Sequence, residues 1–236
     1  EDITFVLEAL GPLDDRSLSD CISAAFQCRA ILVLQVLVRL VKSRGLVSTD
    51  APTEFDMDKM LLLAIDGHNS VDLAQVFLEA GANANLITPD RESCLYMVCR
   101  TSGSRQGAHL VVQALLRSGA DVTKAIGSSG TALHAALLDG CHPETVRVLL
   151  DAGMDVDCRF GSHGTPLHVA AGVKTSGTVI LPPYRQGDNG YSATAKILLD
   201  HDADYRAKDE HGLTALEIAV AAQNQSVVRL LLQSGA

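Results

Sequence analysis

The sequence predicts an all-α solenoid, in which helix–turn–helix units stack along the chain and short β-hairpin fingers connect them. Three observations predict this fold: two recurring phrases, a register that both phrases share, and turn residues that suit helix ends. The first phrase is an aliphatic run followed by a small turn and, in most copies, an acidic or amide residue. It occurs at residues 76–83, 115–121, 149–155, 198–204 and 231–236. A segment that recurs in this way is typical of repeat proteins.

The second phrase keeps the spacing of the first. It reads Gly-Thr-Ala-Leu-His-Ala-Ala at 130–136, Gly-Thr-Pro-Leu-His-Val-Ala at 164–170 and Leu-Thr-Ala-Leu-Glu-Ile-Ala at 213–219, with a diverged copy at 93–98. Its leucines, at positions 95, 133, 167 and 216, are 38, 34 and 49 residues apart. The turns of the first phrase, at positions 81, 119, 153 and 202, have the same three spacings. Two phrases in one register establish a real repeat.

Each unit suits two helices and a tight turn. Thr165 can cap the first helix with its hydroxyl, and Pro166 suits the first helical position, where no amide donor is needed. Pro143 suits the same position in a second helix. Gly153 follows that helix at a point where a left-handed residue commonly ends a helix. The polar stretch between each turn and the next Thr predicts an extended, hairpin-like finger.

These phrases resemble the ankyrin repeat, whose signature is a Thr-Pro-Leu-His helix start, a second helix and Gly-Ala-Asp before a β-turn. The resemblance is strong from about residue 58 to the end, and 164–170 matches almost completely. It implies about six to seven units of roughly 33 residues each. It also implies that His134 and His168 hold adjacent turns together through hydrogen bonds to the backbone and to the nearby Thr. The Gly-Thr-Ala-Leu phrase resembles fungal-style arrays attached to signalling or NTPase-type proteins.

Several positions depart from the family pattern. Asp202 replaces the turn glycine of the fourth unit, and Glu217 replaces the motif histidine of the fifth. Gly130 and Gly164 directly precede Thr, whereas the family pattern has one residue between them. The copy at 93–98 is blurred throughout. We expect these changes to alter local turn geometry and to leave the fold intact.

The phrases divide the chain into two regions. Residues 1–52 are expected to form diverged N-terminal helical units that cap the array, with helices around 17–27 and 29–42. Residues 53–236 are expected to form the repeats, at about 53–85, 86–123, 124–157, 158–206 and 207–236. Because the chain opens without Met and stops where a next finger begins, we expect it to be excised from a longer protein.

The helix expected at 29–42 is apolar on almost every side. Between residues 31 and 41, Gln35 and Arg39 are the only polar residues. A helix with this composition is normally buried on several sides. We therefore expect residues 1–11, or a preceding domain, to cover it.

The fourth unit carries an insertion at about 174–190, between its two helices. The centre of the insertion contains Val179, Ile180, Leu181 and Tyr184, which is unusual for a solvated loop. One interpretation is that this apolar centre packs on neighbouring helices, since long insertions cost little free energy. The other is that the insertion binds a partner. The sequence leaves both open.

Composition excludes several classes of protein. The 236 residues are 47% hydrophobic and 20% charged, so the chain can bury a core and is not disordered. Its 19 basic and 28 acidic residues give a net charge of −9, which disfavours nucleic acid or an anionic membrane as a partner. The most apolar stretch is too short to span a bilayer. Six cysteines without close pairs favour reduced thiols in an intracellular protein, cytoplasmic or nuclear.

The sequence contains no motif for catalysis or cofactor binding. It has no GxxxxGK[ST] loop, no GxGxxG after a strand and no GxSxG elbow. No cysteine or histidine group has zinc-like spacing. We therefore expect no catalytic residue, no metal and no cofactor.

The function predicted from these observations is non-catalytic recognition of a protein or peptide by a module that is monomeric in isolation. The concave surface of a repeat array, formed by finger tips and first helices, is suited to such binding. The residues expected to contact the partner lie on the fingers, at the ends of first helices and in the insertion: Arg91, Lys124, Arg159, Phe160, His163, Arg206, Arg100, Leu138, Asp139 and Tyr184. Arg159 and Phe160 are the strongest of these, because Arg and aromatic anchors dominate interface energies. Phe160 has an alternative role, in which its ring packs on the neighbouring finger.

Two other functions remain open. One is an enzyme or small-molecule-binding protein with a pocket under the 174–190 insertion, whose candidate polar groups are His163, His168, Tyr184, Tyr191 and Asp188. An enclosed pocket with at least two convergent polar groups would favour it. The other is a structural spacer within a multidomain protein, which a smooth, charged groove without an apolar patch would favour.

Overall fold

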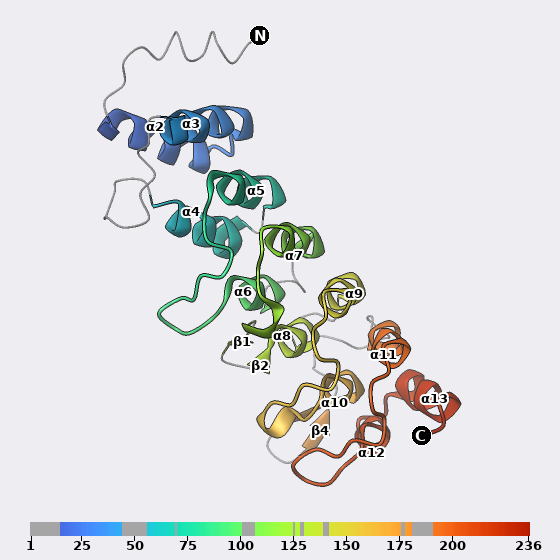
Figure 1. Ribbon diagram of the computed structural model, residues 1–236. Coiled ribbons are helices and arrows are strands. Elements are labelled where there is room, and N and C mark those ends of the chain that lie inside the picture. Colours follow the sequence, from blue (N-terminus) through green and yellow to red (C-terminus); the bar gives the residue numbers. More distant parts are fainter. Residues whose placement is uncertain are drawn as a thin grey trace. The chain divides into compact units, whose positions relative to one another are not determined.

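The computed structural model describes residues 15–43, 56–68, 70–100, 107–124, 126–127, 130–138, 142–175, 178–180 and 191–236 (Figure 1). The chain divides into two compact units, residues 1–84 and residues 85–236. Helices dominate both units, and two short two-stranded sheets belong to the second. The structure is therefore the all-α solenoid that the repeats predict.

The described part of the first unit is built from paired helices. These elements are α2 (Asp15–Gln27), α3 (Ile31–Ser43), α4 (Met57–Leu63), the π-helix η1 (Ala64–His68) and α5 (Val71–Ala80). Helix α3 packs between α2 and α5, and α4 packs on α5. The core includes Leu18, Leu37 and Leu61, with the rings of Phe26 and Phe77 centred 6.0 Å apart.

One helix start differs from the expectation for this unit, and residues 1–11, which were expected to cover that helix, lie outside the described residues. Helix α3 begins at Ile31 instead of 29, because Arg29 adopts a left-handed conformation (φ 53°) that ends α2 and turns the chain. Helix α3 buries Leu34 and Val41, as its composition predicts, but Leu32 is 78% exposed. The apolar side of α3 near its N-terminus is therefore open among the described residues.

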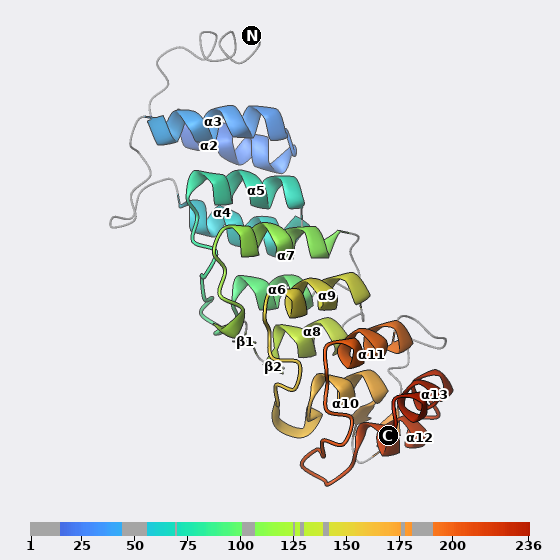
Figure 2. The same cartoon turned by 45° about the vertical axis from the view of Figure 1, so that its right-hand side comes forward.

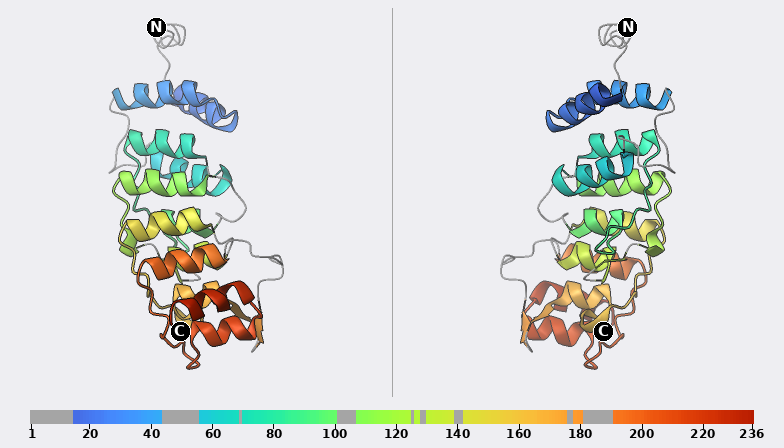
Figure 3. Two further views of the ribbon diagram at one scale, coloured as in Figure 1. Left: turned by 90° about the vertical axis from the view of Figure 1, so that its right-hand side faces the viewer. Right: turned by 90° about the vertical axis from the view of Figure 1, so that its left-hand side faces the viewer.

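The second unit has two layers of helices. The first helices of its repeats form one layer: α6 (Cys94–Arg100), α8 (Ala132–Leu138), α10 (Pro166–Ala171) and α12 (Ala215–Ala221). The second helices form the other: α7 (Ala108–Arg117), α9 (Pro143–Asp151), α11 (Tyr191–Asp200) and α13 (Gln225–Gln233). Each helix contacts the next helix of its own layer and its partner in the repeat (Figures 2 and 3).

The helix ends follow the signals in the sequence. Pro143 and Pro166 occupy the first turns of α9 and α10, and Thr165 is the N-cap residue of α10. Gly153 adopts a left-handed conformation (φ 89°) after α9. Asp202 adopts the same conformation (φ 64°) after α11, in place of the family's glycine. The substitution therefore preserves the turn at the cost of a conformation that an L-residue adopts less readily.

The fingers of the second unit are short antiparallel turns. Strand β1 (Ile126–Gly127) pairs with β2 (Gly130–Thr131), with Ile126 opposite Thr131. Single bridges close the other fingers, between Ile87 and Ser93, Phe160 and Gly164, and Lys208 and Thr214. The 3₁₀ turns η3 (Val122–Lys124) and η4 (Gly161–His163) lie next to these fingers.

The insertion begins as a hairpin. Strand β3 (Val173–Thr175) pairs with β4 (Thr178–Ile180), with Val173 opposite Ile180. Strand β3 contacts α10, and β4 contacts α12 of the next repeat. The backbone of these two strands therefore lies beside α10 and α12, and the packing of the apolar side chains of the insertion stays a prediction. Leu181 and Tyr184 lie outside the described residues.

Candidate functional site

The fingers of the second unit are joined to one another through the second phrase of the repeat. His134, on α8, is completely buried and bonds to two groups. Its Nε2 lies 3.1 Å from the carbonyl oxygen of Gly164 in the next finger, and its Nδ1 lies 2.9 Å from the Thr131 hydroxyl. Because a carbonyl only accepts, Nε2 carries the proton and Nδ1 accepts from Thr131. Burial lowers the pKa of His134 from 6.5 to about 4, so the ring is neutral at pH 7.

His168, on α10, repeats this arrangement one unit later. The backbone N–H of Thr165 donates to Nδ1 at 3.1 Å, and the Thr165 hydroxyl lies 2.7 Å from the same atom. The Nε2 atom donates to the carbonyl of Leu213 in the next finger at 3.1 Å. Burial is the main cause of the lowered pKa of His168. Both histidines therefore join adjacent turns, which confirms the role that the resemblance implied.

The other two copies place different residues at the histidine position. Tyr96, on α6, is fully buried, and its ring occupies the space that a side chain at Gly127 would fill in the next finger. Glu217, on α12, accepts from the backbone N–H of Thr214 at 2.7 Å and from its hydroxyl at 3.0 Å. These bonds to Thr214 lower the pKa of Glu217, the backbone bond most strongly. The same position thus supplies an aromatic contact in one repeat and a helix cap in another.

Arg159 and Phe160 are engaged in contacts within the fold. The Phe160 ring is half-buried, and its centre lies 6.2 Å from that of His134. A Cβ atom at Gly130 would lie 2.9 Å from the Phe160 ring, so the close fit needs glycine there. Arg159 donates from Nη1 to the carbonyl of Lys208 at 2.7 Å. This geometry favours the alternative in which Phe160 packs on the neighbouring finger.

The finger at residues 85–93 is closed by its own backbone. Thr88 donates its N–H to the carbonyl of Glu92 at 2.9 Å and accepts at its carbonyl from Arg91 at 2.8 Å. The Thr88 hydroxyl also accepts from the N–H of Glu92 at 3.1 Å. Arg91 is exposed and adopts a left-handed conformation (φ 62°), and Ile87 is 60% exposed. The finger therefore presents an aliphatic and a cationic side chain on an ordered turn.

Ile87 is a candidate that the sequence analysis missed. The signal was present, because Leu86 and Ile87 are two aliphatic residues inside a finger segment that is mostly polar. Sequence alone does not distinguish an aliphatic residue that points inward from one that points outward at a turn. The bridge between Ile87 and Ser93 fixes the turn that leaves Ile87 exposed.

The other residues expected to contact a partner are spread over several repeats. Lys124 pairs with Asp121 at 3.3 Å, Arg100 with Glu92 at 3.5 Å, and the guanidinium of Arg206 lies 5.3 Å from the centre of the Tyr205 ring. Leu138 is half-buried at the end of α8, and His163 is half-buried in η4. Asp139 and Tyr184 lie outside the described residues. The structure therefore brings Phe160 against His134, Arg159 against Lys208 and Arg100 against Glu92.

Cys158 lies beside His134 but lacks the features of a nucleophile. Its Sγ is 4.0 Å from His134 Nδ1 and 3.3 Å from the Thr131 hydroxyl. Burial, the largest cause, raises the pKa of Cys158 to about 11, so the sulfur is a thiol at pH 7. The histidine nitrogen already accepts from Thr131, and it is therefore not available as a general base.

The candidate groups of the enzyme alternative do not converge in the described residues. Both ring nitrogens of His168 are bonded within the fold, and Tyr191 is 2% exposed at the start of α11. Asp188 lies outside the described residues. Among the residues that the structure describes, no group of three or more His, Cys, Asp or Glu side chains is placed to hold a metal ion. None of the described helices is both long and apolar enough to cross a membrane.

Comparison with protein families identifies the repeat. The family model for ankyrin repeats in three copies matches residues 61–159 and 103–179. The model for a single ankyrin repeat matches residues 211–236. No curated protein matches the chain significantly. The matched segments contain both buried histidines and the finger at residues 85–93.

Proposed function

Because the chain belongs to the ankyrin-repeat family, we propose that it binds a protein or peptide partner through the fingers and the ends of the first helices in residues 85–236. Ankyrin repeats generally act as protein–protein interaction modules. The proposal adds a location to that general role. It places the main contact on the finger at residues 85–93, with Ile87 and Arg91 as its anchors.

One observation carries this proposal: Ile87 is 60% exposed on a finger that is already closed by hydrogen bonds. An exposed aliphatic side chain gains free energy when a partner removes it from water, at about 25 cal/mol per Å². A preformed turn also loses little conformational entropy on binding. Arg91 beside it can form a bidentate pair with a carboxylate of the partner. The finger is thus a small preorganised contact.

The remaining predicted contacts take supporting roles in this proposal. Lys124, Arg100 and Arg206 are exposed cations that already interact within the fold. A partner would have to replace these interactions, so each cation would add little to the free energy of binding. His163 and Leu138 are half-buried. Arg159 and Phe160 set the spacing of the fingers. Their substitution would change binding through the scaffold as well as through contact.

Affinity capture from an extract of the source cells tests the location. The test variant is Ile87→Ala with Arg91→Ala. The matched control is Leu110→Ala with Arg117→Ala on α7, which removes a 43% exposed leucine and an exposed arginine from a second helix. We expect the protein that the wild type captures to be lost from the test variant and kept by the control. If both variants keep it, or both lose it, the finger is not the site.

A variant without residues 175–190 separates the finger from the insertion in the same experiment. We expect this variant to capture the partner as the wild type does. Loss of the partner from the deletion variant alone would move recognition to the insertion.

A further inference from the structure

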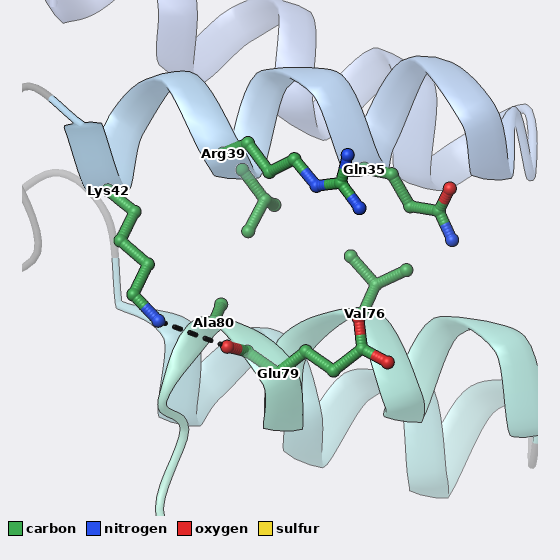
Figure 4. Close-up of a pocket in the computed structure, with 7 residues that line it drawn as sticks. Gln35, Arg39, Lys42, Val76, Glu79 and Ala80 are labelled. Carbon is green, nitrogen blue, oxygen red and sulfur yellow. Dashed lines mark hydrogen bonds between the residues drawn. The ribbon is translucent and has the colours of Figure 1, made fainter.

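A second surface lies in the first unit, on helices α3 and α5. Helices α3 and α5 are both second helices of their pairs, and a groove of about 190 Å³ runs between them (Figure 4). Seven residues line it: Gln35, Val38, Arg39, Lys42, Val76, Glu79 and Ala80. The groove is therefore separate from every residue of the proposed finger site.

The polar residues of α3 are aligned along this groove. Gln35, Arg39 and Lys42 follow one another at i, i+4 and i+7, which places them on one face of a helix. Gln35 and Arg39 are also the two polar residues that interrupt the apolar run at 31–41. The floor between the helices is aliphatic and consists of Val38, Val76 and Ala80. The groove thus combines an apolar floor with a polar rim.

The rim groups differ in how they are used by the fold. Lys42 Nζ donates to the carbonyl of Glu79 at 3.2 Å, near the end of α5 (Figure 4). The Glu79 carboxylate accepts from Gln75 at 2.9 Å. Arg39 makes no hydrogen bond or ion pair within the part of the chain that the structure describes. Its exposed guanidinium therefore keeps all its donors for a ligand.

We propose that this groove binds a short segment of a partner protein that pairs a carboxylate with a neighbouring aliphatic side chain. The carboxylate pairs with the guanidinium of Arg39, which matches a carboxylate in a bidentate manner. The aliphatic side chain lies in the groove of about 190 Å³ against Val38, Val76 and Ala80. Because these three are already only 3–5% exposed, it contributes van der Waals contact and shape fit, and the carboxylate contributes most of the recognition. The Gln35 amide, on the same rim, donates to the backbone of the bound segment.

The charges of the rim decide the sign of the ligand. Arg39 and Lys42 give two positive charges against the single negative charge of Glu79. The net charge of −9 on the whole chain repels an acidic segment at long range, but salt screens that repulsion beyond about 10 Å. Near the groove the local positive rim dominates. Glu79 opposes the bound carboxylate, so its neutralisation strengthens binding.

A phage-displayed library of random 12-residue peptides tests this proposal on the whole chain. Peptides are selected on the wild type and counter-selected on Arg39→Glu. We expect the enriched peptides to share an Asp or Glu beside Leu, Ile or Val. Their affinity falls at least about tenfold in Arg39→Glu and rises in Glu79→Gln. If no peptide survives the counter-selection, or if the survivors share no acidic residue, the proposal is wrong.

Arg16→Glu is the matched control for the charge change. Arg16 is an exposed arginine on α2, so this variant alters the net charge of the chain equally without touching the groove. We expect the selected peptides to bind Arg16→Glu as they bind the wild type. An equal loss of affinity in both variants would show that the peptides respond to net charge, which would overturn the assignment to the groove. Unchanged thermal unfolding of Arg39→Glu confirms that its loss of binding is local.

Discussion

Two fingers of the second unit differ in the contacts that their side chains make. The finger at 160–164 is closed by its own backbone, and His134 of the preceding repeat also bonds to Gly164 and packs on Phe160. The finger at 85–93 is closed by bonds between Thr88, Arg91 and Glu92, and its first residue, Asn85, bonds to the next repeat, at Gly119 and Asp121. Contacts from a neighbouring repeat already engage the side chains whose residue types best suit an interface with a partner. In the finger at 85–93, by contrast, the side chains of Ile87 and Arg91 are exposed to solvent.

The comparison teaches that residue type alone does not identify an anchor. Phe160 has the size and aromatic character of an interface hot spot, yet its ring fills the space beside Gly130. Ile87 is smaller and more exposed. We therefore base the proposed anchor on its exposure on a preformed turn. Four changes test this contrast.

Substitution His134→Ala removes the tie from the preceding repeat to the finger at 160–164. The Gly164 carbonyl and the Thr131 hydroxyl both lose a partner next to a new cavity, and a buried group without a partner costs about 1–3 kcal/mol. We expect the free energy of unfolding to fall by about 2–4 kcal/mol. Urea denaturation followed by circular dichroism measures this. The control is His163→Ala, at a half-buried position in η4. We expect this variant to change the free energy of unfolding by less than about 1 kcal/mol. Equal effects of the two substitutions would contradict the tie.

The same tie makes stability depend on pH. The folded-state pKa of His134 is about 4 against 6.5 when unperturbed, and that of His168 is also lowered. Between pH 6.5 and 4 the unfolded chain binds protons that the folded chain does not, so the free energy of unfolding falls as pH falls. For His134 alone the loss is roughly 2 kcal/mol between pH 7 and 5. Thermal unfolding measured at several pH values between 7 and 5 tests this expected loss of stability.

His134→Gln provides the control for the pH experiment. Glutamine keeps a hydrogen-bonding side chain but does not titrate. The decline in stability between pH 7 and 5 is therefore expected to be smaller in this variant than in the wild type. The pKa of His201 is raised, chiefly by its bond to the Ile197 carbonyl, so His201 changes the free energy of unfolding in the opposite direction as pH falls. Because His201 is present in both proteins, its effect cancels in the comparison. Identical declines in the two proteins would exclude His134 as the cause.

Phe160→Ala tests the scaffold role of the aromatic ring. The ring is half-buried against His134, so its removal should lower the free energy of unfolding by about 1–2 kcal/mol. If Phe160 were instead an exposed anchor, the first role that its residue type predicts, its loss would leave stability unchanged. Ile87→Ala is the matched comparison and should change stability by less than about 0.5 kcal/mol. Chemical denaturation of both variants separates the two roles, and equal stability losses would remove the contrast between the fingers.

The fold was predictable because its signals are local and repeated. Caps such as Thr165, helix starts such as Pro166 and turns such as Gly153 each act within a few residues. Their recurrence at matching spacings made the helix order readable without any long-range information. Where a local signal was weak, the prediction was inaccurate: the left-handed turn at Arg29 shortened one helix. The β3–β4 hairpin likewise formed where only a loop was expected.

The candidate site was less predictable because it depends on contacts between distant residues. The orientation of Phe160 depends on the missing side chain of Gly130, 30 positions earlier in the chain. The exposure of Ile87 depends on its bridge to Ser93. The groove between α3 and α5 depends on the packing of two helices whose sequences show no common motif. None of these features follows from the period of the repeat.

Arg91→Gly is expected to change the free energy of unfolding only slightly, and it gives the sharpest test of the finger. A left-handed conformation costs an L-residue roughly 1–2 kcal/mol, and glycine removes that cost while adding about 0.5–1 kcal/mol of backbone entropy loss. The free energy of unfolding should therefore stay constant or rise by up to about 1 kcal/mol. Partner capture should weaken, because the guanidinium is lost.

Arg91→Lys separates charge from geometry. It keeps the charge and the strained turn but lacks the bidentate donor pair. If Arg91→Gly is less stable than the wild type, the turn does not store strain. If it binds as tightly as the wild type, then Arg91 orders the finger without contacting the partner, and Ile87 alone would carry recognition there.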